Sequence, residues 1–181
     1  MNRTVSGRPQ PGEFATYAQS DIDAVAGEDI VTTLAARMQE TLGVFRGVDE
    51  DSASSVRYAP GKWNLKQVIG HLADDERIFA YRALCVARSD ARSLPGFDEK
   101  DYVNAACFES LPMQELLEDL RIAREGTISL LRGLAPEAWL RTGTVNGYRA
   151  SVRGLAFHIA GHELHHLRII NDKYLPKIVR S

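Results

Sequence analysis

The chain has few cysteines, no long hydrophobic run and no excess of either charge. Its two cysteines, Cys85 and Cys107, are too few for a disulfide framework, and packing is the expected role of both thiols. With 22 basic and 24 acidic residues, the chain lacks the basic surface typical of nucleic-acid-binding proteins. No apolar run reaches the roughly 20 residues of a membrane span, and the N-terminus lacks the apolar core of a signal peptide. These absences predict a cytoplasmic protein that binds neither nucleic acid nor membrane.

The composition is that of a globular protein with one main domain. The chain has 181 residues, of which 44% are hydrophobic and 25% are charged, and this length suffices for a substantial core. Residues 1–27 contain Pro9, Pro11 and several glycines and are expected to form an extended N-terminal arm with at most one helical turn. The domain is expected to span residues 28–175, followed by a tail at 176–181.

Four stretches carry the three- and four-residue spacing of apolar side chains that is typical of amphipathic helices. In the first stretch Ile30, Leu34 and Met38 follow this spacing. The second begins at Asn64, a good N-cap residue, with Gln67 three positions later as in a capping box. The predicted helices span residues 28–47, 64–88, 112–133 and 151–172.

Two shorter features interrupt this pattern. Residues 98–108 are compatible with a short helix, and the Asn146-Gly147 pair within residues 134–150 is typical of a β-hairpin turn. Ser151 then caps the last long helix. Four long amphipathic helices with a short excursion before the last one predict an all-α four-helix bundle.

The histidines are concentrated near the end of the chain. Four of the five fall within residues 158–166. His162 and His166 are four positions apart and therefore share one helical face, where Leu155 and Ile159 also lie. A buried imidazole needs a partner for its ring nitrogens, and a metal ion satisfies both histidines at once.

Residues 162–166 also match the His-Glu-x-x-His pattern of zinc peptidases, in which the glutamate, here Glu163, is the general base. Such enzymes usually take a third ligand from downstream. Only 15 residues follow His166, and none is histidine or glutamate. A metallopeptidase is therefore the less favoured interpretation.

The remaining histidine, His71, lies beside the apolar face of the second predicted helix. If that helix packs against the fourth, His71 completes a three-histidine site with His162 and His166. Three protein ligands with an open position are typical of catalytic zinc, and the same ligands suit nickel, iron or cobalt. The alternative is a purely structural histidine packed in the core.

Two residues near His71 are candidates for a role in catalysis. Asp75, one turn later on the same face, is placed to accept a hydrogen bond from a ligand imidazole or from water, or else to form an ordinary salt bridge. Arg82, two turns further, either holds an anionic substrate group or extends its charge to solvent. Its neighbour Tyr81 is a second candidate for contact with substrate.

The other charged and aromatic residues of the histidine stretch have two interpretations each. Glu163 either orients a metal ligand and assists proton transfer, or pairs with a cation from another helix. His158 and His165 lie at the edges of the apolar face, and we expect partly exposed or supporting groups there rather than ligands.

Several segments resemble the DinB-like family. They are RYAPGKWNLKQVIGHL at 57–72, ERIFAYRAL at 76–84, LPGFD at 94–98 and GHELHHL at 161–167. The resemblance covers roughly residues 28 to 175 in the expected order.

The resemblance implies an up-down-down-up order of the four helices and a divalent metal, usually nickel or zinc, with iron, cobalt or manganese as further candidates. It implies that His71, His162 and His166 hold this metal, and that the protein forms a homodimer. Relatives include thiol-dependent transferases and proteins described as metal-dependent hydrolases.

The sequence therefore predicts a metal-dependent enzyme that acts on a small molecule, either transferring a low-molecular-weight thiol or hydrolysing its substrate. His71, His162 and His166 are the expected metal ligands, and Asp75, Glu163 and Arg82 the expected catalytic group. The alternative from another class is a metal-stabilised or metal-sensing helical protein without turnover.

Overall fold

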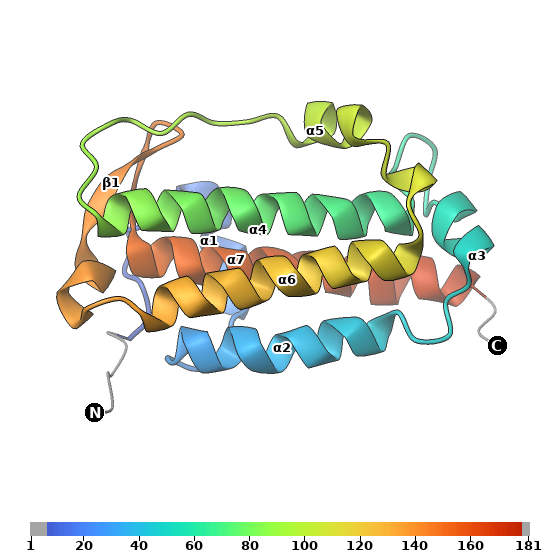
Figure 1. Cartoon of the computed structure of the whole chain (residues 1–181), viewed down its shortest axis with the longest axis horizontal. Helices are drawn as coiled ribbons and strands as arrows, with labels where there is room; N and C mark the ends of the chain where they lie inside the picture. Colours follow the sequence, from blue (N-terminus) through green and yellow to red (C-terminus); the bar gives the residue numbers. More distant parts are fainter. Residues whose placement is uncertain (1–6, 179–181) are drawn as a thin grey trace.

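Four long helices form the body of the protein. The computed structural model describes residues 7–178, and the long helices are α2 (Ile30–Val44), α4 (Leu65–Ala87), α6 (Met113–Arg132) and α7 (Val152–Ile169). Helices α2 and α7 run in one direction, and α4 and α6 in the other (Figure 1). Both α2 and α4 pack against α6 and α7. The bundle is therefore up-down-down-up, as predicted.

A long crossover connects α4 to α6, because two parallel neighbours cannot be joined by a short turn. It runs along the outside of α4 and contains α5 (Glu99–Ala106) and the 3-10 turn η2 (Phe108–Ser110) (Figure 1). Helix α5 packs on α4. This connection covers the side of α4 that carries His71.

The N-terminal segment folds onto the bundle. The 3-10 turn η1 (Thr16–Ala18) continues into α1 (Gln19–Ala24), and α1 packs against α7. Of the arm predicted at 1–27, residues 7–27 therefore belong to the packed structure, with Ile22 buried. Residues 1–6 lie outside the described part of the chain.

The predicted hairpin is present. Strands β1 (Thr142–Val145) and β2 (Tyr148–Ser151) pair antiparallel, preceded by the 3-10 turn η3 (Pro136–Leu140). Asn146 and Gly147 both have positive φ, 49° and 78°, as a tight two-residue hairpin turn requires.

The region between α2 and α4 differs from the prediction. Helix α3 (Glu50–Ser55) lies between the helices predicted at 28–47 and 64–88, and Asp49 caps it by accepting a hydrogen bond from the backbone N–H of Ser52. This helix is polar, so it has no apolar spacing from which it could be predicted. Asn64 and Gln67 form the expected capping box of α4.

The last helix ends in irregular turns. Helix α7 is capped by Ser151, as predicted, and continues into the π-turn η4 (Ile170–Tyr174) and the 3-10 turn η5 (Leu175–Lys177). Tyr174 is buried, and so is Ile178, which belongs to the tail predicted at 176–181. Residues 179–181 lie outside the described part.

The core is divided by a polar layer. One apolar cluster surrounds the end of α4 and the start of α7, and a second surrounds the start of α4 and the end of α7. Buried polar residues of α4, α6 and α7 lie between the two clusters. They are Asp75, Glu76, Arg124 and Glu163.

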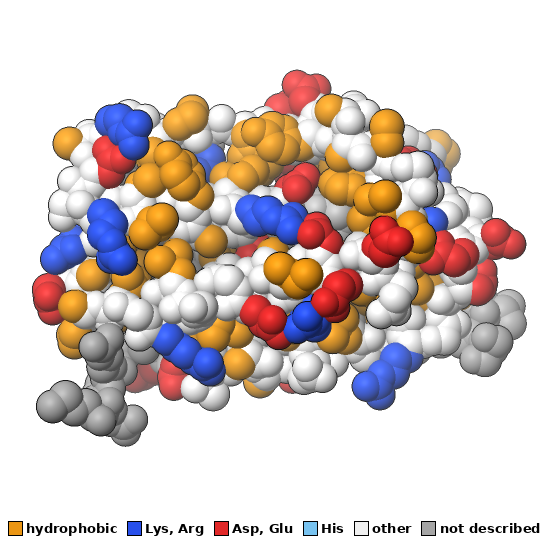
Figure 2. Space-filling model, viewed as in Figure 1, with side chains coloured by type: hydrophobic (Ala, Val, Ile, Leu, Met, Phe, Trp, Pro, Cys, Tyr) orange, Lys and Arg blue, Asp and Glu red, His pale blue; other side chains and the backbone are white. Residues whose placement is uncertain are grey.

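The outer face of α4 and α6 is mixed. Figure 2 shows acidic and basic side chains interspersed with hydrophobic ones there, without a field of one sign. Among residues 7–178, no helix combines the length and hydropathy needed to span a bilayer.

An added methyl group is expected to have opposite effects on stability at two glycines. A Cβ on Gly161 of α7 would lie 2.4 Å from the backbone oxygen of Asp21, so Gly161→Ala must push α1 away and is expected to destabilise the fold by about 1–3 kcal/mol. Gly126 of α6 has nothing within 4 Å of its virtual Cβ, and Gly126→Ala should stabilise by about 0.5–1 kcal/mol. Urea unfolding of both variants measures this, and equal effects would contradict the close approach of α1 to α7.

Candidate metal centre

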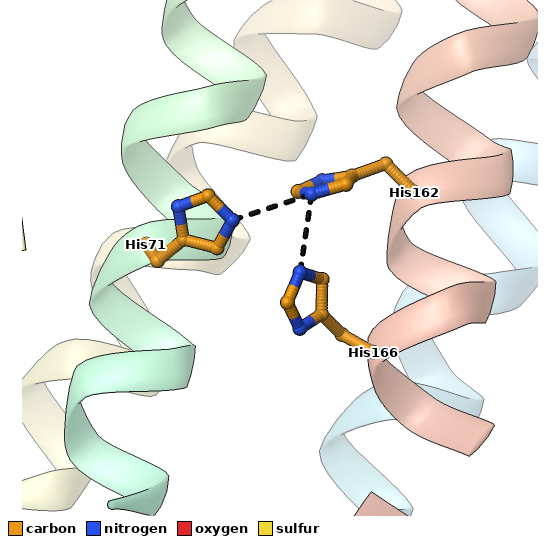
Figure 3. A group of neighbouring side chains, drawn as sticks. All are labelled: His71, His162 and His166. Atoms are coloured by element: carbon orange, nitrogen blue, oxygen red, sulfur yellow. Dashed lines mark hydrogen bonds between the residues drawn. The ribbon is translucent and has the colours of Figure 1, made fainter. Parts of the chain in front are cut away.

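Three histidines from two helices converge at one end of the polar layer. His71 comes from α4, and His162 and His166 come from successive turns of α7 (Figure 3). Nε2 of His162 lies 3.2 Å from Nε2 of His71 and 3.1 Å from Nε2 of His166. One ring nitrogen from each lies within 4.8 Å of the others. These three residues are called the histidine cluster below.

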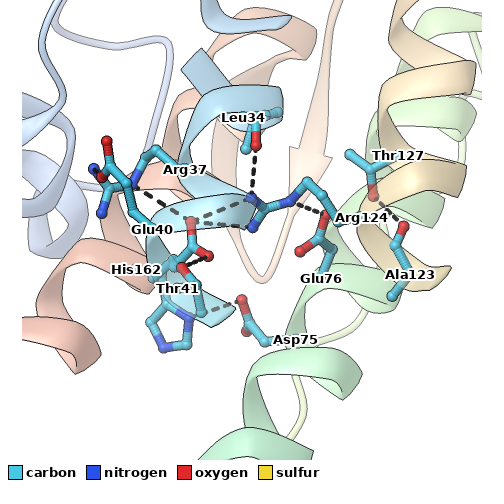
Figure 4. Close-up of polar contacts among 11 residues, drawn as sticks. Leu34, Arg37, Glu40, Thr41, Asp75, Glu76, Ala123, Arg124, Thr127 and His162 are labelled. Carbon is cyan, nitrogen blue, oxygen red and sulfur yellow. Dashed lines mark hydrogen bonds and ion pairs between the residues drawn. The ribbon is translucent and has the colours of Figure 1, made fainter. Parts of the chain in front are cut away.

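Asp75 sets the orientation of His162. It lies one turn after His71 on α4, and Nδ1 of His162 donates to its Oδ2 at 3.1 Å (Figure 4). Burial alone would raise the pKa of Asp75, but the charge and hydrogen bond of His162 outweigh burial and lower this pKa to about 2. Asp75 is therefore ionised and holds the proton of His162 on Nδ1, which directs the Nε2 lone pair at the cluster.

Burial favours the neutral form of two of the three imidazoles in the cluster. Burial and the neighbouring His162 lower the pKa of His71 to about 4, and burial with the same neighbour also lowers the pKa of His166. For His162, burial opposes the charged form, but Asp75 outweighs it and raises the pKa. Neutral imidazoles are the form in which histidine binds metals.

The donor set fits a divalent metal ion. Three Nε2 atoms converge, and with the proton of His162 on Nδ1 their lone pairs face one another. Nitrogens at about 2.0–2.1 Å from a tetrahedral ion lie roughly 3.3 Å apart, close to the 3.1 and 3.2 Å found here. An ion between the rings would satisfy all three nitrogens.

Trp63 and Glu99 complete the surroundings of His71. The Trp63 ring packs on His71 with centroids 4.9 Å apart, and the Tyr174 hydroxyl donates to the Trp63 carbonyl at 2.6 Å. Oε2 of Glu99, from α5, lies 4.0 Å from Nε2 of His71. Neither residue stood out in the sequence, because both reach the site from connecting segments rather than from an amphipathic face.

Two cavities meet at the cluster. The Trp63 cavity, about 580 Å³, lies on the side of Trp63 and Tyr58. The Arg82 cavity, about 540 Å³, lies on the side of Asp75 and Arg82. The two share four lining residues: Glu99, Lys100, His165 and His166. The histidines are thus accessible to small molecules from two directions.

The structure places the other predicted site residues in different surroundings. Arg82 is buried and lines the same cavity as Asp75, whereas Tyr81 is 53% exposed and lines neither cavity. His158 is buried and stacks on Phe79 with ring centroids 4.1 Å apart. Of the two alternatives expected for His158, partial exposure or a supporting role, the structure excludes partial exposure, because α1 and the hairpin cover this face of α7.

The side chains of His165 and Glu163 are not part of the histidine cluster. The His165 side chain is 47% exposed, as expected, and faces Asp21 at 3.5 Å. Glu163 accepts from the Thr41 hydroxyl at 2.6 Å and pairs with Arg124 of α6 at 3.2 Å. The structure thus has Glu163 paired with a cation from another helix, one of its two interpretations, and its geometry gives no support to a general-base role.

The Glu163 contacts belong to a buried ion cluster that joins all four long helices (Figure 4). Arg124 donates to Glu76 of α4 at 2.6 Å and to the Leu34 carbonyl of α2 at 3.1 Å. Arg37 of α2 lies 3.5 Å from Glu163. The members of the buried ion cluster are Arg37, Thr41, Glu76, Arg124 and Glu163.

The comparisons with known proteins agree with this geometry. The chain is 25% identical over 139 residues to the protein named "Putative metal-dependent hydrolase OB0413" of Oceanobacillus iheyensis, which covers 76% of this chain and 77% of that one. Its fold is similar to that of YfiT from Bacillus subtilis, with a TM-score of 0.67, 18% identity and coverage of 91% of this chain and 89% of that chain. YfiT is described as "a probable metal-dependent hydrolase with an unusual four-helix bundle topology".

The family model of the DinB superfamily matches residues 32–170, which is more than half of the chain and includes His71, His162 and His166. The resemblance inferred from the sequence motifs is thereby confirmed. This chain belongs to the DinB superfamily.

Proposed function

We propose that the protein is a metal-dependent hydrolase of small molecules in which His71, His162 and His166 hold one divalent ion. The observation that carries the proposal is a cluster of three histidine nitrogens that opens onto two cavities and that, among residues 7–178, has no fourth ligand atom within 4.8 Å of all three. A structural metal site is normally closed by a fourth protein ligand, whereas a catalytic site keeps a position open.

The ion would supply two effects in such a site, polarisation of a carbonyl or phosphoryl oxygen and a lower pKa of water. The side chains around it have distinct roles. Asp75 fixes the tautomer and orientation of His162, and the Trp63 ring limits the rotation of His71. Glu99 lines both cavities within 4.0 Å of His71 and is the carboxylate best placed to exchange a proton with a bound substrate or water.

Transfer of a low-molecular-weight thiol is the second candidate. It is favoured by the pair of cavities, because a two-substrate reaction needs room for both reactants next to the ion. A metal-sensing role without turnover is the third, and cavities of this size argue against it. Nickel and zinc are the proposed ions, since histidine nitrogens suit both.

The test is elemental analysis of untagged protein followed by activity measurements. We expect about one equivalent of a transition metal per chain, and hydrolysis of chromogenic ester or amide substrates that is lost on chelation and restored by added metal. Turnover only in the presence of an added thiol would favour transfer, and bound metal without turnover in either assay would favour the sensing role. Protein that binds no transition metal would overturn all three.

A further inference from the structure

Arg82 is a buried cation that forms no ion pair with any residue among 7–178. Its exposed fraction is 4%, and it lies on α4 about three turns after His71. Among residues 7–178 it makes one hydrogen bond, from Nη2 to the Pro95 carbonyl at 2.7 Å, and no ion pair. A guanidinium carries five N–H donors. The nitrogens of Arg82 that do not bind Pro95 are not among the fully buried unsatisfied atoms of residues 7–178, so their N–H groups open onto the Arg82 cavity.

Two aromatic rings pack against the guanidinium of Arg82. Its Cζ lies 4.8 Å from the centroid of the Phe79 ring and 5.5 Å from that of Phe97, so the cation lies over both rings. The remaining N–H donors lie in the plane of the group, which borders the Arg82 cavity. An edge of this kind binds a carboxylate or a phosphate through two oxygens.

Among residues 7–178, no carboxylate that lines the same cavity forms an ion pair with Arg82, although Asp75 is near enough to favour the charged form of Arg82 against the effect of burial. These carboxylates face histidines or cap a helix. Asp21 faces His165 at 3.5 Å, Asp75 faces His162 at 3.1 Å, Asp98 accepts from the backbone of Lys100 and Asp101 at 2.8 and 3.2 Å, and Glu99 lies 4.0 Å from His71. The cation of Arg82 is therefore left for a group that comes from outside the chain.

The wall between Arg82 and the histidine cluster is aromatic. The Phe79 ring, which contacts the guanidinium of Arg82, stacks on His158 with ring centroids 4.1 Å apart. The His158 ring in turn lies parallel to the His162 ring, with centroids 5.8 Å apart. This row of rings provides a flat surface from the cationic end of the cavity to the histidines.

We propose that Arg82 is an anion-binding residue that selects substrates with a carboxylate or phosphate at one end. The apolar or planar middle of such a substrate lies along Phe79 and His158, and its reactive group reaches the histidine cluster. The inference rests on the proposed function only in treating the bound anion as a substrate. Binding of the anion at Arg82 does not itself require turnover.

Calorimetric titration of the full-length protein tests the site. The probes are 3-phenylpropionate, phenyl phosphate and the neutral 3-phenylpropanamide, each added to zinc-loaded and to chelator-treated protein. We expect at least one of the two anions to bind roughly tenfold or more tightly than the amide in both forms. The stronger of the two identifies the carboxylate or the phosphate, and binding to the metal-free form excludes an anion held by zinc.

Variants separate anion binding from structural support. Arg82→Met should abolish the preference for the anion, and Arg82→Lys, which keeps the charge but loses the paired donors, should weaken it roughly tenfold while preserving the fold. Arg77→Met on the same helix removes a cation that pairs with Asp119 outside the cavities, and should leave binding unchanged. Circular dichroism verifies that each variant is folded.

Two outcomes would overturn the inference: equal binding of the anions and the amide by the wild type, or a preference that survives in folded Arg82→Met. The second would show that Arg82 only fastens the 94–98 segment to α4 through Pro95. An intact anion preference in a protein that hydrolyses nothing would support the Arg82 site and remove the proposed reaction, so the two failures are distinguishable. With a hydrolysable substrate, Arg82→Lys should raise KM for an anionic ester and leave KM for its neutral analogue unchanged.

Discussion

Arg124→Met is expected to lower the free energy of unfolding by about 3–5 kcal/mol, which is a large part of the total stability of a domain of this size. Arg124 is 1% exposed and faces Glu76 and Glu163, each 2% exposed. Methionine fills a similar volume but leaves the two carboxylates without their shared cation. Chemical denaturation at pH 7 measures the loss.

The two carboxylates are affected differently. Glu163 retains Thr41 and Arg37 when Arg124 is removed. Among residues 7–178, Glu76 forms an ion pair with Arg124 alone, at 2.6 Å, and burial already raises the pKa of Glu76 against the opposing effect of Arg124. Most of the expected loss therefore comes from the isolated charge of Glu76.

This assignment predicts a dependence on pH. Without Arg124 the pKa of Glu76 in the folded state rises further above its unfolded value. A carboxyl group whose folded pKa is raised binds its proton more readily in the folded state, so it destabilises the fold above that pKa and ceases to do so as the pH falls. Arg124→Met should consequently be less harmful at pH 5 than at pH 8.

Two controls isolate the buried charge. Arg121→Met, one turn earlier on α6, removes a partly exposed arginine that pairs with Glu118 and Glu125, and should change stability by at most about 1 kcal/mol. The double variant Glu76→Gln, Arg124→Met removes both partners and should be more stable than Arg124→Met alone. A double variant that is less stable than the single one would contradict the role assigned to Glu76.

The helices and the histidine cluster could be predicted because both depend on local spacing. The apolar periodicity located α2, α4, α6 and α7, and the four-residue step between His162 and His166 placed both rings on one face. Adding His71 required only that α4 and α7 be neighbours, which the resemblance to a four-helix bundle implied.

The roles of the charged residues could not be predicted in the same way. Glu163 follows His162 directly, and one residue corresponds to a rotation of about 100° around the helix axis. Its side chain therefore points into the buried ion cluster, where partners from α2 and α6 determine its role. Glu99 reaches His71 from the crossover, whose path no local pattern specifies. Tertiary packing also explains the burial of His158, since the elements that cover it come from the N-terminal segment and the hairpin.

The second large effect is expected for a pair of adjacent histidines. His166→Ala should lower the affinity for zinc by more than about 100-fold, because it removes one of three ligands, while His165→Ala should leave the affinity nearly unchanged. The two substitutions remove the same side chain from neighbouring positions of α7, so their effects on helix propensity are matched.

The contrast follows from where the two rings lie. Nε2 of His166 is 3.1 Å from Nε2 of His162, within the cluster, whereas His165 faces Asp21 on the rim of both cavities. Competition with a chromogenic chelator measures both affinities, and the melting temperature with and without zinc provides an independent measure, because a bound ligand stabilises the folded state. Equal affinities for the two variants would mean that the ion, if bound, is not held by the third nitrogen of the cluster. A loss confined to His165→Ala would shift the site towards Asp21 and the exposed end of α7.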